Sequence, residues 1–180
     1  MGLFNWLASK LGVQTEQDKK GLEGSKRLIF ILKQIIRHLK FADVLTETDG
    51  YGAVYTVNFS RFILNLEDAL AGLKEAKNTV LNLLNQLDKK RIPLNYRDYR
   101  RLSAQDRVLF DFLSRLLKQL QHNSEILMRL VKDVKSGSKS HLDDELDRQN
   151  NLEQEKIKVI KNIQRVLLHI KALQQKIGEF

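Results

Sequence analysis

Apolar residues recur along this chain at alternating spacings of three and four, the period of helices that pack along a continuous seam. The pattern predicts long helices at about 58–89, from just after Ser103 to about Ser136, and from Ser140 to about Ile177. Another helix is expected to begin near Thr15 or Ser25 and to continue to about Leu45, and a short one covers residues 2–11. The predicted seam positions are Leu28, Leu32, Ile35 and Leu39; Phe59, Phe62, Leu66, Ala69, Leu73, Ala76, Val80, Leu83 and Leu87; Leu109, Leu113, Leu116, Leu120, Asn123, Leu127, Leu130 and Val134; and Ile160, Ile163, Leu167, Ile170 and Ile177, with Leu173 adjacent.

Capping and breaking residues support these boundaries. Thr15, Ser103 and Ser140 are each followed three residues later by an aspartate, a near-match to the capping box in which side chains satisfy the free amides of a first helical turn. Residues 46–56 break the helical pattern at Asp49-Gly50 and Gly52, and residues 54–57 are expected to be briefly extended, with no convincing partner strand.

The fold predicted from these elements is all-α: an elongated antiparallel bundle of about four long helices, coiled-coil-like, plus a short N-terminal amphipathic helix. Helices of roughly 30–38 residues extend about 45–57 Å, and short turns between them require antiparallel neighbours. The expected organisation is an N-terminal helix at 1–13 and a bundle domain at 14–180.

Composition narrows the classes of function. With 42% hydrophobic and 29% charged residues, the chain has enough apolar material for a packed core. It contains no cysteine, which excludes disulfides and thiolate metal sites. No apolar run approaches the roughly 18–20 residues that span a bilayer, and no signal peptide is recognisable, so the expected location is the cytoplasm, with peripheral membrane contact left open.

No catalytic, metal or cofactor site is predicted. The four histidines are never spaced i, i+4, as helical metal ligands are, and no phosphate-binding glycine loop occurs. Arg115 and His122 are separated by six residues, a spacing that resembles the Arg-x(4–6)-His pair of HEPN-type ribonucleases, which are also helical bundles. Leu116 stands where that family usually has a polar residue. The resemblance leaves a ribonuclease as the third hypothesis.

The connection between the two central long helices is the densest cationic region of a chain whose net charge is +9. Tyr96 and Tyr99 alternate with cations that supply donors to phosphate. An inter-helix loop whose cations cap a helix end explains the same residues. The candidate anion-binding residues are Lys89, Lys90, Arg91, Arg97, Arg100, Arg101 and Arg107.

The N-terminal segment is amphipathic. On a helical wheel its apolar residues share one arc, with Trp6 and Lys10 at the border, where indole and ammonium groups meet lipid headgroups. Docking of this helix on the bundle or on a partner protein is the alternative. The candidate insertion residues are Leu3, Phe4, Trp6, Leu7 and Leu11. The opening Met-Gly-Leu-Phe and the amphipathic turn after it are similar to the starts of PspA-type and ESCRT-III-type membrane-remodelling proteins, although the break at residues 50–57 interrupts what would be their long hairpin.

These features predict a non-enzymatic helical-bundle interaction protein. The expected partner is an anionic membrane surface or another helical protein, bound through the N-terminal helix with help from the basic connection. The alternative is nucleic-acid binding through residues 89–107. Because a heptad seam closes equally well within or between chains, a homo-oligomer is also compatible with the pattern.

Overall fold

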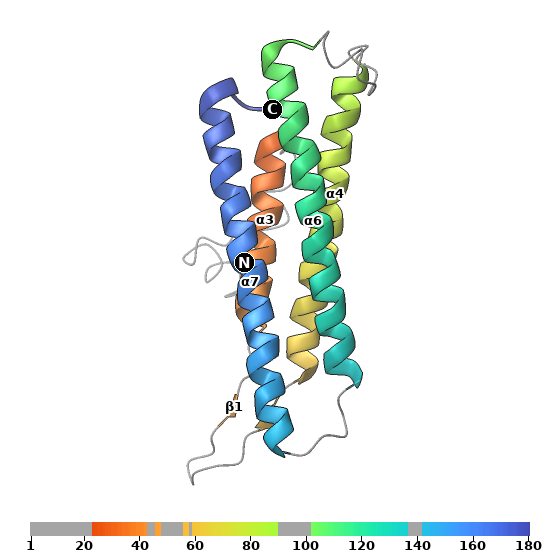
Figure 1. The fold of residues 1–180 in the computed structure, drawn as a ribbon, viewed down its shortest axis with the longest axis vertical. Helices are drawn as coiled ribbons and strands as arrows, with labels where there is room; N and C mark the ends of the chain where they lie inside the picture. The colour runs from red at the N-terminus through yellow and green to blue at the C-terminus, as the bar shows by residue number, and fades with distance from the viewer. Residues whose placement is uncertain (1–22, 43–45, 48–55, 58, 90–101, 137–141) are drawn as a thin grey trace, which may run out of the picture.

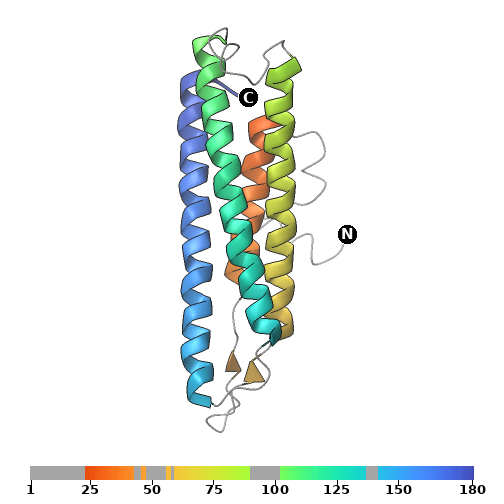
Figure 2. The same ribbon diagram turned by 45° about the vertical axis from the view of Figure 1, so that its right-hand side comes forward.

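The computed structural model describes residues 23–42, 46–47, 56–57, 59–89, 102–136 and 142–180. In this part of the chain, α3 (Gly24–Phe41), α4 (Phe59–Lys89), α6 (Ala104–Ser136) and α7 (Leu142–Ile177) form an elongated bundle (Figure 1). Successive helices run in opposite directions, and each packs against two others, in the order α3, α4, α6, α7 and back to α3 (Figure 1, Figure 2). The predicted all-α fold is confirmed. The helix expected at residues 2–11 lies outside the described residues.

The core follows the predicted seams of α3, α4 and α6. Every predicted seam residue of these helices whose side chain is described is buried, and Asn123 is buried in line with the leucines, at 1% exposure. Thirteen of them are completely enclosed. These are Leu28, Leu32, Ile35, Leu39, Phe62, Leu66, Ala69, Leu73, Ala76, Val80, Leu113, Leu120 and Leu127.

The predicted seam of α7 was wrong by a rotation of the helix. Val159 and Val166 are buried together with Ile163 and Ile170, whereas Ile160 and Leu167 are only partly buried at the edge of the core. The cause is Lys156, which occupies a seam position at 2% exposure and hides the heptad rhythm in the sequence. Val159 and Val166 continue that rhythm. Ile160 and Leu167, beside them, lie on the side of α7 that faces α3.

Two predicted boundaries also need correction. α3 ends at Phe41, four residues before the predicted Leu45, because Ala42 leaves the helical conformation at φ −76°, ψ 59°. The extended segment predicted near residues 54–57 does have a partner: β1 (Thr46–Glu47) pairs antiparallel with β2 (Thr56–Val57). The short sheet joins α3 to α4 at one end of the bundle (Figure 2).

The start of α6 behaves as the capping signal predicts. The Ser103 hydroxyl accepts a hydrogen bond from the Asp106 amide at 3.1 Å and donates to the Asp106 carboxylate at 2.8 Å. One free amide of the first turn is thereby satisfied.

The helices do not approach one another equally. α4 lies close to α3 and α6, whereas α7 stands further from its neighbours. Small residues on α4 explain the difference: a Cβ on Gly72 would lie only 2.6 Å from Ile35 Cγ1 of α3, and Ala69 and Ala76 flank this glycine in the seam. α7 presents a lysine and larger aliphatic residues instead, so its backbone is held further away.

Candidate binding face

Most of the binding residues predicted from sequence lie outside the described residues. This holds for Leu3, Phe4, Trp6, Leu7 and Leu11, and for the cations between residues 90 and 101. Lys89 is the last residue of α4, and Arg107 is a half-buried residue in the first turn of α6. Neither hypothesis about those segments is tested by the described structure.

A different cationic surface emerges from the arrangement of the helices. Residues 24–42, which include all of α3, contain five lysines or arginines and no carboxylate. Residues 156–178, which include the whole second half of α7, contain six and again no carboxylate. The topology places these two stretches side by side, so eleven cations gather on one pair of antiparallel helices (Figure 1).

Polar contacts at both ends of α3 set the register of this pair. At its start, the Gln174 amide donates to the Ser25 hydroxyl at 2.9 Å, and the Ser25 amide donates to the Phe180 carbonyl. At its end, the Lys156 ammonium donates to the Ala42 carbonyl at 2.8 Å. From Ser25 to Ala42 and from Lys156 to Gln174, the two helices therefore span nearly the same length, about 26 Å at 1.5 Å per residue.

The close approach at the start of α3 depends on a glycine. Gly24 has φ +55°, and the Phe180 carbonyl lies where a Cβ would project. Phe180 reaches this position because Gly178, at φ +81°, ends α7 in the left-handed conformation that follows many helices. The Phe180 ring then packs edge-on against Phe112 of α6, with centroids 6.3 Å apart.

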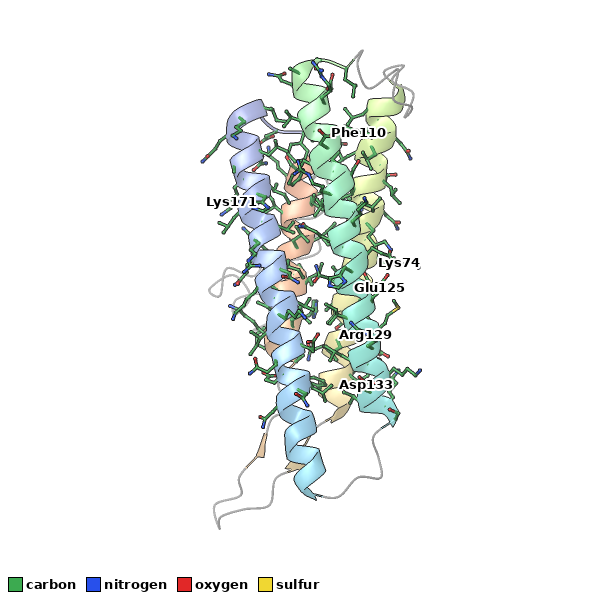
Figure 3. All side chains as sticks on the ribbon, viewed as in Figure 1. Lys74, Phe110, Glu125, Arg129, Asp133 and Lys171 are labelled. Atoms are coloured by element: carbon green, nitrogen blue, oxygen red, sulfur yellow. The ribbon has the colours of Figure 1, made fainter. Side chains whose placement is uncertain are left out.

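The contact between Ser25 and Gln174 shows which cations of α3 and α7 lie on the same surface of the bundle. Lys33 and Lys40 follow Ser25 by eight and fifteen residues, about 80° and 60° further around α3, away from the core. On α7, Lys171 lies about 60° outward from Gln174, and Figure 3 shows it at the outer side of that helix. The remaining cations of the surface, Lys161 and Arg165, lie one to two turns before Leu168 on the exposed side of α7.

We call the surface formed by five cations and one leucine the cationic face: Lys33, Lys40, Lys161, Arg165, Lys171 and Leu168. It extends about 20 Å along the bundle. All five cations are exposed, and none has an ion pair within the described residues. Leu168 is 65% exposed, the highest value among the large hydrophobic residues described as exposed. Partly buried aliphatic side chains lie between the two helices, beneath the cations. These are Ile29, Ile36, Ile160 and Leu167.

Stability does not account for this charge distribution. Two of the other helix pairs carry ion pairs across their joints: Arg27 with Glu75 at 3.1 Å between α3 and α4, and Lys135 with Glu67 at 2.7 Å between α4 and α6. The two stretches themselves offer no carboxylate for such a pair, and Lys26 instead pairs with Glu179, beyond the end of α7, at 2.9 Å. In addition, the first turn of α3 carries Lys26 and no acid, although the positive end of the helix dipole disfavours cations there.

Sequence reasoning missed the cationic face even though part of its signal was present. The two stretches without acids, of 19 and 23 residues, are visible in the sequence. Only the fold shows that they are neighbours, and only the contacts of Ser25 and Lys156 show which sides meet.

Other chemistry finds less support in the described part of the chain. No group of histidines and carboxylates there is arranged to hold a metal ion. Arg115 and His122 are both exposed on α6, seven residues or about 10.5 Å apart along the axis, and neither lines the two hollows beside Phe180. No described helix is both long and apolar enough to cross a membrane.

No family model, curated protein or solved structure matches the chain.

Proposed function

We propose that this protein is a non-enzymatic helical-bundle interaction module that attaches to anionic membrane surfaces through the cationic face. The observation that carries the proposal is the gathering of the five exposed cations of this face, none with an ion pair within the described residues, on adjacent stretches of α3 and α7 that contain no carboxylate. Each lysine or arginine near an anionic leaflet contributes about 1 kcal/mol to binding at moderate salt. The amphipathic segment at residues 2–11 would add shallow insertion of its apolar side chains.

A lipid surface fits this face better than a nucleic acid. Leu168 projects between Arg165 and Lys171 on α7, so an exposed aliphatic side chain is flanked by cations on consecutive turns. A headgroup layer offers both anions and apolar material below them. A nucleic acid offers the anions of its backbone and bases that stack on aromatic side chains, whereas Phe41, the exposed aromatic residue beside Lys40, is already covered by the Arg37 guanidinium at 5.6 Å.

Co-sedimentation with vesicles tests the proposal. The full chain is mixed with phosphatidylcholine vesicles, with and without phosphatidylserine, at about 0.1 M and about 1 M salt. We expect binding only to the phosphatidylserine vesicles and only at the lower salt. Reversal of three charges, in Lys33→Glu/Lys161→Glu/Lys171→Glu, removes about 3 kcal/mol or more, which is a loss of about a hundredfold in partitioning.

The matched control reverses three exposed lysines on α4 and α6, in Lys74→Glu/Lys118→Glu/Lys132→Glu. It changes the net charge by the same amount on other faces of the bundle. Retained binding by this control supports the cationic face, and equal loss in both variants contradicts it. Binding of duplex DNA or RNA at the lower salt, without binding to vesicles, would favour the nucleic-acid alternative instead.

A second comparison separates the two modes of attachment. Deletion of residues 2–12 removes the amphipathic segment and leaves the cationic face intact. If the charge-reversal variant and the deletion each weaken binding, both contribute. If only the deletion does, the cationic face has no part in attachment.

A further inference from the structure

The four joints between the helices of the bundle differ in the contacts that close them. The α3–α4 and α4–α6 joints combine close backbone approach with interhelical ion pairs. The α3–α7 joint is wider, and polar groups close both of its ends: Gln174 meets Ser25 and Lys26 meets Glu179, just beyond α7, at one end, and Lys156 meets Ala42 at the other. Water can satisfy these groups when the helices separate, so their loss opposes opening only weakly.

The α6–α7 joint also has a polar centre. The Asn162 amide donates to the Asn123 side-chain carbonyl at 3.2 Å, and Asn123 in turn donates to the Gln119 backbone carbonyl at 2.9 Å. This pair lies in the seam, at the level where a leucine would continue the apolar rhythm. Both joints of α7 thus include polar contacts that hydration can replace, beside the apolar contacts of its buried residues Val159, Ile163 and Ile170.

Electrostatic repulsion acts on the same helix. Lys33 of α3 comes level with about residue 166 of α7, and Lys40 with about residue 159, since Ser25 is level with Gln174. Both lysines thus face a stretch of α7 that carries only cations. Like charges on neighbouring helices repel one another, and salt screens the repulsion.

We infer that α7 is the helix that opens from this bundle, and that neutralisation of the cationic face closes it. An anion bound across α3 and α7 removes the repulsion and contacts both helices at once. By linkage, a ligand that binds the closed form better than the open form shifts the population towards the closed form. Attachment to a membrane would then tighten the bundle; this last step rests on the proposed function, and the opening itself does not.

Hydrogen exchange of the full chain, followed by mass spectrometry, tests the inference. At low salt, amides of residues 156–177 are expected to exchange faster than those of residues 62–87 in α4, because local opening exposes α7 without unfolding the rest. Raising the salt is expected to slow exchange in α7 selectively. Equal protection of the two segments, or no response of α7 to salt, would overturn the inference.

Charge variants test the cause. Lys161→Glu/Lys171→Glu puts carboxylates on the helix beside the α3 lysines and is expected to slow α7 exchange at low salt by roughly fourfold, at about a factor of two for each reversed exposed charge. Lys161→Gln/Lys171→Gln removes the repulsion without adding attraction and should give a smaller slowing. The control Lys118→Glu/Lys132→Glu, on α6, should leave α7 exchange unchanged.

The ligand experiment distinguishes the two proposals. Phosphatidylserine vesicles are expected to slow exchange in α7 beyond the effect of salt. Vesicle binding that leaves α7 exchange unchanged refutes the coupling and leaves the proposed function standing. Salt-sensitive opening without any effect of vesicles keeps the opening and counts against the membrane as ligand.

Discussion

Replacement of Gly72 by alanine separates two physical effects that act in opposite directions. Gly72 lies inside α4, where alanine is favoured over glycine by about 1 kcal/mol because it loses less backbone entropy on folding. Its added Cβ, however, would lie 2.6 Å from Ile35 Cγ1 and 3.4 Å from Ile35 Cδ1. The nearer atom belongs to a completely buried, β-branched side chain that has little freedom to move.

The magnitude follows from these two terms. Overpacking of a tight core site costs about 1–3 kcal/mol. After the gain in helix propensity is subtracted, Gly72→Ala should destabilise the bundle by about 1 kcal/mol, a fall of about 2–4 °C in melting temperature for a domain of this size. Urea denaturation followed by circular dichroism measures the change in the free energy of unfolding.

Two controls isolate the contact with Ile35. Ala71→Gly, at the exposed neighbouring position, reports the propensity difference in the same turn and should lose about 1 kcal/mol. In the double variant Gly72→Ala/Ile35→Ala, the new methyl group has room. The double variant should therefore lose less free energy of unfolding than the sum of the losses in the two single variants. A Gly72→Ala protein more stable than the wild type would show that this glycine does not limit the approach of α3 to α4.

Three further substitutions test other contacts by the same denaturation assay. Ser103→Ala should cost about 1 kcal/mol, because the Asp106 amide loses its acceptor in the first turn of α6; an unchanged midpoint would show that the cap is dispensable. Asn123→Leu should cost about 1–3 kcal/mol by leaving the amide of Asn162 without its partner, whereas replacing both asparagines by leucine should recover most of that loss. Gly178→Ala should cost about 1 kcal/mol, because the residue has φ +81° although its Cβ would meet no atom within 4 Å; a neutral effect would contradict the backbone argument.

Much of the fold follows from the sequence because heptad spacing reports which residues face a seam. On α4 the apolar rhythm is continuous, on α6 it is interrupted by Asn123, and the structure buries the seam residues of both helices. On α7 the rhythm is interrupted by Lys156, whose ammonium finds the Ala42 carbonyl of another helix. A contact between residues 114 positions apart leaves no trace in local spacing, so the orientation of α7 was misassigned.

The candidate site was harder to predict for a related reason. A charged surface built from two segments depends on which helices become neighbours and on their register. Lys33 and Lys171 are far apart in the sequence, and each reads there as an ordinary exposed lysine of an amphipathic helix. The dense cluster at residues 89–107 attracts attention because its members are consecutive. The cationic face becomes visible only when α3 is placed against α7.

The central claim is that the cationic face rests on the lipid surface, and a single label tests it directly. The chain contains no cysteine, so Leu168→Cys gives one attachment point for a polarity-sensitive fluorophore, and Leu81→Cys on α4 gives a matched exposed control. With phosphatidylserine vesicles at about 0.1 M salt, the emission of the label at position 168 should shift to the blue while that at position 81 stays unchanged. A shift at position 81 alone, or at neither position while the protein is bound, would contradict attachment through α3 and α7.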